Sequence, residues 1–147
     1  MLVFTRNGEY IRTIGEPGNG LDSNSTTHFA RVAEIAIDRL GTEAYLADGY
    51  TNRRVAVIDV ATGAFKRYWG VYGNRPDDDA DNSYVPGQAL PQQFKGPVHC
   101  AEPSNADLNY VCDSGRDSIQ VVRPEGTFIK DGCTSAQKRA VGLHQEC

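Results

Sequence analysis

The sequence lacks the features that mark several specialised classes of protein. Its 147 residues contain no apolar run near the roughly 20 residues that a membrane-spanning helix needs. The 15 Lys and Arg residues do not exceed the 19 Asp and Glu residues, and the net charge of −4 provides no basic surface for phosphate. We therefore expect no membrane span and no nucleic-acid partner. The 39% hydrophobic and 23% charged residues are ordinary for a packed globular protein.

A targeting segment is also missing from the residues at hand. No charged and then apolar leader precedes Leu2, and the first residues already have the pattern of a strand. A signal peptide would lie upstream of this start. The N-terminus therefore predicts no compartment.

The cysteines lack the paired C-x-x-C spacing of a structural zinc site. Four are present, at positions 100, 112, 133 and 147. If residues 97–102 and 109–113 form a hairpin, Cys100 lies opposite Cys112. Directly opposed residues of an antiparallel pair are close enough for a disulfide. Two buried thiols are the alternative, because free cysteine is a common core residue.

Helical spacing is absent beyond a turn or two, and the chain is organised by an internal repeat instead. Residues 29–48 align without a gap on residues 94–113, and both copies end in an aspartate, Asp48 and Asp113. In each copy a turn, an alternating strand, a glycine-ending turn and a short aromatic-led strand follow. Residues 1–20 have the pattern of the second half of this unit. The chain thus contains half a unit and two whole units.

Each whole unit has the pattern of four short strands bounded by Gly, Asp and Asn turns. Four antiparallel strands per repeat are typical of a propeller blade, and a closed ring needs about four to eight blades. We expect an all-β fold, a partial and open β-propeller of four-stranded antiparallel blades. The remaining blades belong to a longer chain, or other copies complete the ring. The expected parts are a half blade (1–20), a blade (29–70), a long inter-blade loop (71–93), a second blade (94–131) and an irregular tail (132–147).

Two segments carry a resemblance to a known family. Residues 45–59 read Tyr-Leu-Ala-Asp-Gly-Tyr-Thr-Asn-Arg-Arg-Val-Ala-Val-Ile-Asp, and residues 110–122 are a weaker copy. This pattern resembles the NHL repeat. Within that superfamily the chain is similar to the peptidyl-α-hydroxyglycine α-amidating lyases, which are six-bladed propellers. Three motifs carry the narrower similarity: His28-Phe29, Asp48-Gly49-Tyr50-x-Asn52-x-Arg54, and Phe94-x-x-Pro97-Val98-His99.

The resemblance implies a zinc chemistry. In the lyases three histidines from different blades hold zinc, a tyrosine acts near the reacting hydroxyl, and arginines hold the substrate carboxylate. By position, His99 would be a zinc ligand and Tyr50 the catalytic tyrosine. Arg116 is the candidate for the arginine, although Ser114 directly follows the aspartate. The other two histidines would lie outside this chain, so we expect the isolated chain to be inactive. The same resemblance favours a secreted or periplasmic protein.

We expect structural roles for the aspartates of the sequence. Asp48 and Asp113 recur in both units, which favours a structural corner where the carboxylate accepts backbone N–H groups. Asp113 is also expected to face His99 across the hairpin and to orient its imidazole, as an outer partner of a metal ligand does. The acidic run at residues 77–81 is better explained as a solvated loop than as a calcium site.

These observations leave two candidate functions. The leading one is an NHL-propeller segment that acts as a binding scaffold for protein, peptide or small ligand. The alternative is a piece of a zinc-dependent lyase acting on peptidyl-α-hydroxyglycine-like carbinolamides. Function is expected where the two units differ: at Tyr50, in the 71–93 loop, and at His99, which replaces Glu34.

Overall fold

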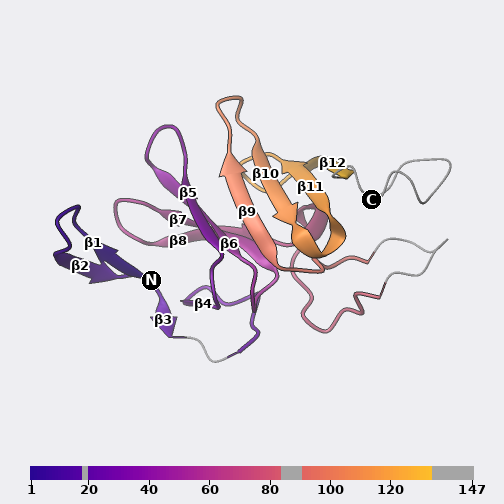
Figure 1. Ribbon diagram of the computed structural model, residues 1–147, viewed down its shortest axis with the longest axis horizontal. Coiled ribbons are helices and arrows are strands. Elements are labelled where there is room, and N and C mark those ends of the chain that lie inside the picture. The colour runs from indigo at the N-terminus through magenta and orange to yellow at the C-terminus, as the bar shows by residue number, and fades with distance from the viewer. Residues whose placement is uncertain (18–19, 84–90, 134–147) are drawn as a thin grey trace.

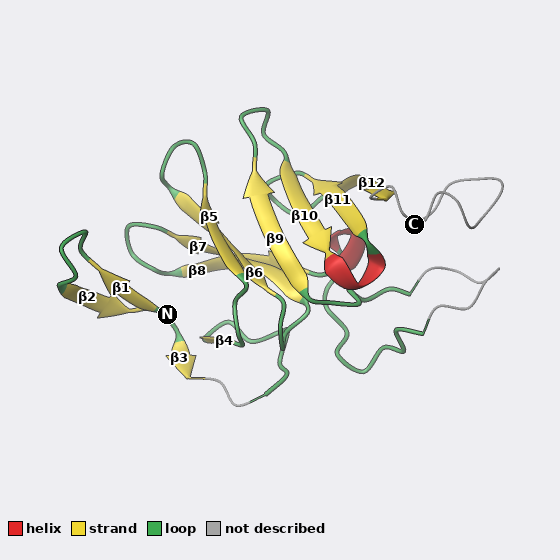
Figure 2. Cartoon of the chain, in the orientation of Figure 1, coloured by secondary structure: helices red, strands yellow, loops and turns green. Residues whose placement is uncertain are grey.

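The computed structural model describes residues 1–17, 20–83 and 91–133. The tail from residue 134 and the central part of the predicted loop, residues 84–90, lie outside the described residues. The described chain is all-β, as predicted, and its only helices are two single 3₁₀ turns (Figure 2). The first strands are β1 (Leu2–Phe4), β2 (Tyr10–Thr13), β3 (Glu16–Pro17) and β4 (His28–Phe29).

Two four-stranded antiparallel sheets form the body of the protein (Figure 1). Sheet I has the order β5-β6-β7-β8 and sheet II the order β9-β10-β11-β12. The strands of sheet I are β5 (Glu34–Ile37), β6 (Glu43–Asp48), β7 (Arg54–Asp59) and β8 (Phe65–Trp69). Those of sheet II are β9 (Val98–Pro103), β10 (Asn109–Asp113), β11 (Ser118–Val122) and β12 (Phe128–Cys133). The 3₁₀ turns are η1 (Val71–Gly73) and η2 (Ser114–Arg116).

The tight turns of sheet I follow from Asp, Thr and Gly residues. Asp38 accepts hydrogen bonds from the backbone N–H groups of Thr42 and Glu43, which closes the β5–β6 turn. Burial acts to raise the pKa of Asp38, but the hydrogen bond from the Thr42 hydroxyl together with these two backbone bonds outweighs it, and the pKa is lowered. Gly41 takes the left-handed conformation, with φ 72°, that this turn needs. The sequence therefore specifies where strand β5 ends and β6 begins.

Alternating side chains give sheet I two apolar faces. Tyr45, Ala47, Val55 and Val57 face sheet II, where they share a core with Phe94, Val98, Ala101 and Val111. Ala44, Leu46, Ala56 and Ile58 face the opposite way and pack with Ile14, Met1 and Val3 of the β1–β2 hairpin. The middle strands are consequently buried on both sides, which is why β6 and β7 read as almost continuous apolar runs.

The β1–β2 hairpin covers only part of its side of sheet I. Arg12 of β2 donates hydrogen bonds to the carbonyls of Val60 and Ala61 and so attaches the hairpin to the turn between β7 and β8. Strand β5 forms one edge of sheet I. Its Ile35 and Ile37 pair with Leu46 and Ala44 of β6 and lie on the same face as these two residues. They nevertheless remain 51% and 56% exposed. Sheet I therefore has one fully covered face and one half-covered face.

Candidate functional site

Three side chains that the repeat does not share meet at one end of the two sheets. Arg31 precedes β5, Tyr50 follows β6, and His99 lies on β9. Strand β9 packs against β5 and β6, so the end of sheet I and the start of β9 are neighbours. We call these three residues the Arg31–Tyr50–His99 site.

Tyr50 and His99, both predicted from the sequence, are in direct contact. The Tyr50 hydroxyl is 3.1 Å from Nε2 of His99, within hydrogen-bond distance. The two rings meet edge to face, with 5.7 Å between their centroids. Both side chains are exposed to solvent. The structure thus pairs an aromatic hydroxyl with an imidazole at the surface, where a ligand has access to both.

Arg31 completes the site from the other side of Tyr50. Its guanidinium carbon lies 5.8 Å from the centroid of the Tyr50 ring, a cation–π distance. Its carbonyl accepts a long hydrogen bond of 3.4 Å from the Tyr50 backbone N–H. The Arg31 side chain is exposed, and no carboxylate among the described residues forms an ion pair with it.

The backbone of Arg31 is in an unusual conformation. Its φ is 62°, in the left-handed region that disfavours residues with a Cβ atom. The corresponding residue of the second unit is Gly96, with φ 77°. The corner itself therefore needs a positive φ, and glycine is the residue that adopts it freely. An arginine at this corner is a departure from the scaffold.

The second unit also lacks the other two side chains of the site. Gly115 corresponds to Tyr50, and a Cβ atom there would lie 2.3 Å from the Gly96 carbonyl oxygen. Glu34 corresponds to His99 and accepts a hydrogen bond from the Ala101 backbone N–H, across the two sheets. Among the described residues, therefore, the three side chains come together only at the end of sheet I.

An open groove adjoins the site. It has a volume of about 600 Å³ and lies between the β1–β2 hairpin and β5. Arg31 lines it together with two carboxylates, Glu16 and Glu34, and with apolar residues that include Leu2, Phe29, Val32 and Ile35. A molecule bound at Arg31 has room to extend into this groove.

Two acidic residues, Glu34 on β5 and Glu102 on β9, lie close to each other. Burial raises the pKa of Glu102 on β9, and the nearby Glu34 carboxylate adds to the rise.

Arg116 is not part of the site. Its guanidinium donates hydrogen bonds to the carbonyls of Pro91 and Gln93 and to the side-chain oxygen of Asn82. Its Nε lies 3.7 Å from the Asp113 carboxylate. Arg116 thus fastens the segment before β9 and does not face Tyr50 or His99 as a ligand-binding group.

Arg54 in sheet I makes contacts similar to those of Arg116. Arg54 is fully buried, lies 2.9 Å from Asp48, and donates a hydrogen bond to the carbonyl of His28. His28 corresponds to Gln93, whose carbonyl binds Arg116. The two arginines therefore bind the equivalent backbone carbonyl in their units, although they occupy different positions in the repeat.

The two repeated aspartates hold the corners of the units. Asp48 accepts a hydrogen bond of 2.9 Å from the backbone N–H of Ala30. Asp113 accepts bonds of 2.9 Å from the N–H groups of Lys95 and Gly96. Lys95 corresponds to Ala30, so the contact is the same in both units.

Asp113 does not face His99, contrary to the expectation from the hairpin. It pairs with Val98, because the register shifts by one residue between Cys112 and Asp113. Its carboxylate is taken up by Lys95, Gly96 and Arg116. The expected role of orienting the imidazole was wrong, since a simple hairpin count does not foresee the shift.

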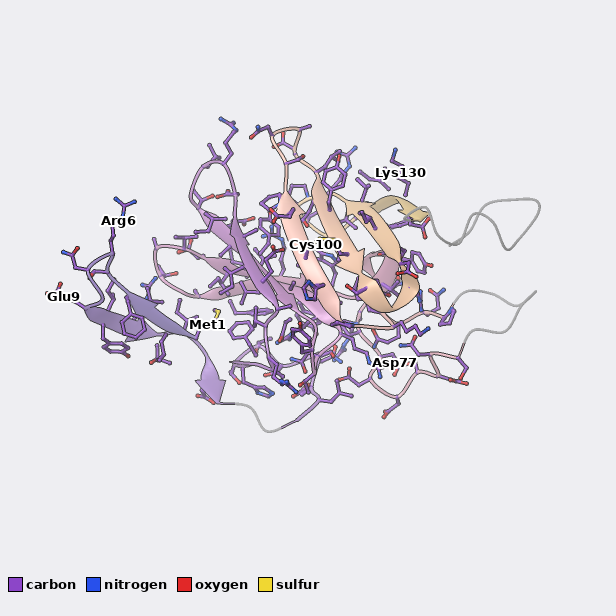
Figure 3. All side chains as sticks on the ribbon, in the orientation of Figure 1. Met1, Arg6, Glu9, Asp77, Cys100 and Lys130 are labelled. Atoms are coloured by element: carbon purple, nitrogen blue, oxygen red, sulfur yellow. A yellow bond between two sulfur atoms is a disulfide. The ribbon has the colours of Figure 1, made fainter. Side chains whose placement is uncertain are left out.

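A disulfide lies beside the site. Cys100 on β9 and Cys112 on β10 are paired in the ladder and their sulfur atoms are bonded. Figure 3 labels Cys100 on β9, next to the end of sheet I. The bridge is therefore one residue away from His99.

The residues that would hold a metal do not fit a zinc site on this chain. In residues 1–17, 20–83 and 91–133 no three His, Cys, Asp or Glu side chains gather as ligands. Within the acidic run, Asp78 accepts a hydrogen bond from the Ser23 backbone N–H, and Asp77 and Asp81 accept bonds from nearby N–H groups. His99 is left as a single imidazole bonded to Tyr50.

Comparison with known proteins adds no relative. No protein-family model matches the sequence, and no curated protein matches it. The described part of the chain contains no helix with the length and apolarity that crossing a bilayer requires. The structure accordingly defines the class of the protein as all-β with two four-stranded antiparallel sheets, and no family is identified.

Sequence reasoning missed Arg31. The signal was present in the repeat, because the gap-free alignment places this charged residue against Gly96. An arginine that aligns with a glycine indicates backbone strain only when the glycine is known to have a positive φ. That conformation is a property of the folded corner.

Proposed function

We propose that the protein is a binding scaffold, an open NHL-type propeller segment whose Arg31–Tyr50–His99 site binds a carboxylate-bearing ligand. The ligand class is a peptide with a free C-terminus, a protein tail of that kind or a small organic acid. One observation carries this proposal: Arg31 occupies a left-handed corner where the other unit has glycine. Strained residues of this kind cluster at functional sites.

The chemistry of the three groups supports a carboxylate. A guanidinium binds a carboxylate through two parallel hydrogen bonds, and Arg31 has no such partner among the described residues. Tyr50 and His99 offer a hydroxyl and a ring nitrogen 3.1 Å apart for a neighbouring polar group. The groove beside Arg31, which apolar residues and the carboxylates of Glu16 and Glu34 line, has room for the rest of the ligand.

Calorimetric titration with acetyl-dialanine tests the proposal, and its C-terminal carboxamide is the matched control. The free acid should bind and the amide should bind at least about tenfold more weakly, because a charged hydrogen-bond pair is lost. Tyr50→Phe and His99→Ala should each weaken binding of the acid. Equal binding of acid and amide, or no binding of either, would refute the carboxylate site.

A lyase remains the second candidate because Tyr50 and His99, its predicted tyrosine and zinc ligand, are in contact. The described residues supply one histidine and no cluster of three ligands. We therefore expect no lyase turnover from these 147 residues by themselves. Metal analysis of the natural full-length protein, with His99→Ala as control, tests the ligand role; unchanged zinc content would end it.

Partners that complete the sheets are part of the same proposal. Within the described residues strand β1 pairs with β2 alone, and Ile35 and Ile37 on β5 are half exposed. An unpaired strand edge next to apolar side chains is a site where a further strand pairs. We assign this role to the remaining blades of a longer chain or to other copies of this one.

A further inference from the structure

The contact between Tyr50 and His99 depends on an irregularity in sheet II. Cys112 pairs with Cys100, and the next residue, Asp113, pairs with Val98. His99 is therefore the extra residue of a β-bulge. A bulge re-aims a side chain and is common beside functional sites.

Sheet I shows the regular alternative for the same two strands. There Glu34, which corresponds to His99, pairs with Ala47, which corresponds to Cys112, and the ladder has no shift. The same register in sheet II would pair His99 with Cys112 and Cys100 with Val111. Because side chains alternate between the faces of a sheet, this one-residue slip would turn residues 100 to 103 to the opposite face, and His99 would no longer be an extra residue.

The disulfide excludes that alternative. Cys100 and Cys112 form the last regular pair before His99, and their sulfur atoms are bonded. In the regular register Cys100 would share a face with Val111, and Cys112 would lie on the other face. The two sulfur atoms could then not meet.

We infer that the Cys100–Cys112 disulfide is a positioning element of the Arg31–Tyr50–His99 site, which fixes the bulge and holds His99 against Tyr50. Its reduction releases the imidazole and weakens ligand binding, a consequence that rests on the proposed function. In the reduction a dithiol supplies two electrons and two protons: the S–S bond breaks, two thiols form, and the dithiol closes into its own disulfide.

Nuclear Overhauser effects between the Tyr50 and His99 rings test this positioning without any ligand. The rings are 5.7 Å apart between centroids, so the oxidised protein should give cross-peaks. Addition of dithiothreitol should reduce these cross-peaks to less than half. The Cys133→Ser/Cys147→Ser variant keeps the bridge and should respond like the natural chain. Cross-peaks that persist after reduction, or that are already missing in this control, would overturn the inference.

A second variant separates positioning from folding. Cys100→Val/Cys112→Val replaces the bridge with a cross-strand apolar pair that favours the sheet. Protected backbone amides in β10 and β11 would show that sheet II is formed. We expect that protection together with weakened ring cross-peaks. Full cross-peaks, or loss of sheet II both here and in the reduced protein, would contradict a specific positioning role.

Affinity for acetyl-dialanine is the second readout. The reduced protein and the valine variant should bind it about tenfold more weakly, since one hydrogen-bonding group is displaced. If the oxidised protein does not bind the probe, the proposed function fails. The ring cross-peaks still decide whether the disulfide positions His99.

Discussion

Arg31 holds a conformation that costs an L residue roughly 1–2 kcal/mol relative to the right-handed region. Its φ of 62° matches the 77° of Gly96 in the second unit, so the strain comes from the corner of the fold. Nothing in the packing of the described core requires the guanidinium, which is exposed and stacks only on Tyr50. The residue is therefore retained at the expense of local stability, as ligand-binding residues often are.

Arg31→Gly should separate stability from binding. The variant relieves the left-handed strain, so its free energy of unfolding should be unchanged or higher by up to about 1 kcal/mol. Its affinity for acetyl-dialanine should fall at least about tenfold. Arg31→Ala is the matched control, because it removes the guanidinium and keeps the strain. Urea unfolding and calorimetry give both quantities, and a destabilised glycine variant that still binds would contradict the account.

Glu43 gives the protein a measurable response to acid. The hydrogen bond from Arg67, supported by Lys66 and Tyr45 and opposed by partial burial, lowers the pKa of Glu43 from 4.5 to about 2. A carboxyl whose pKa is lower in the folded state stabilises the fold above pH 4.5, and this stabilisation is lost as the pH falls toward 2.

Glu43→Gln should consequently lower the free energy of unfolding by about 1–2 kcal/mol at neutral pH. The difference from the natural chain should shrink between pH 4.5 and 2, because protonation removes the same charge. Thermal unfolding across this range measures it. The exposed Glu9→Gln change serves as the control, and a difference that does not depend on pH would rule out the Arg67–Glu43 ion pair as its cause.

The strands of the two sheets show how far the sequence predicts elements. Alternation and turn residues place β5 to β8 within the first predicted unit and β9 to β11 within the second, whereas β12 extends to Cys133, into the segment expected to be an irregular tail. The bulge at His99 has no such signal, because its one-residue shift depends on which side chains the finished ladder can pair. The sequence also does not reveal that Arg54 and Arg116 have the same role. The two arginines do not align with each other in the repeat, and they bind equivalent carbonyls, those of His28 and Gln93, only in the folded protein.

The corner aspartates should differ in their importance. Asp48 and Arg54 are both fully buried, so Asp48→Asn leaves a buried guanidinium without its carboxylate. We expect this to cost about 3–5 kcal/mol in urea unfolding. Asp113→Asn should cost less, because its partner Arg116 is partly exposed, 3.7 Å away and bonded to carbonyls as well. Equal losses would show that the backbone contacts, and not the ion pair, dominate.

The residues that the structure describes leave one side of the molecule uncovered. Ile35 and Ile37 are half exposed, Leu40 is 70% exposed, and β1 has a free edge. Apolar surface and an open edge together favour association. This surface is also the reason to propose that further strands complete the fold.

Ile37→Lys should reduce that association. A lysine on β5, an edge strand of sheet I, blocks edge-to-edge pairing and costs little stability, within about 0.5 kcal/mol, because the side chain is already half solvated. Sedimentation at rising concentration and dye binding should show oligomers or exposed apolar surface in the natural chain and less of both in the variant. A compact monomer without dye binding in the natural chain would contradict the open edge.

The most direct test of the central claim is an NMR titration that observes the His99 and Tyr50 ring resonances. We predict ring-to-ring cross-peaks in the free protein, and shifts of both rings when acetyl-dialanine is added. The carboxamide should cause no such shifts, and neither probe should shift the rings in Arg31→Gly. Rings that give no cross-peaks, or that respond equally to acid and amide, would contradict a carboxylate-binding Arg31–Tyr50–His99 site.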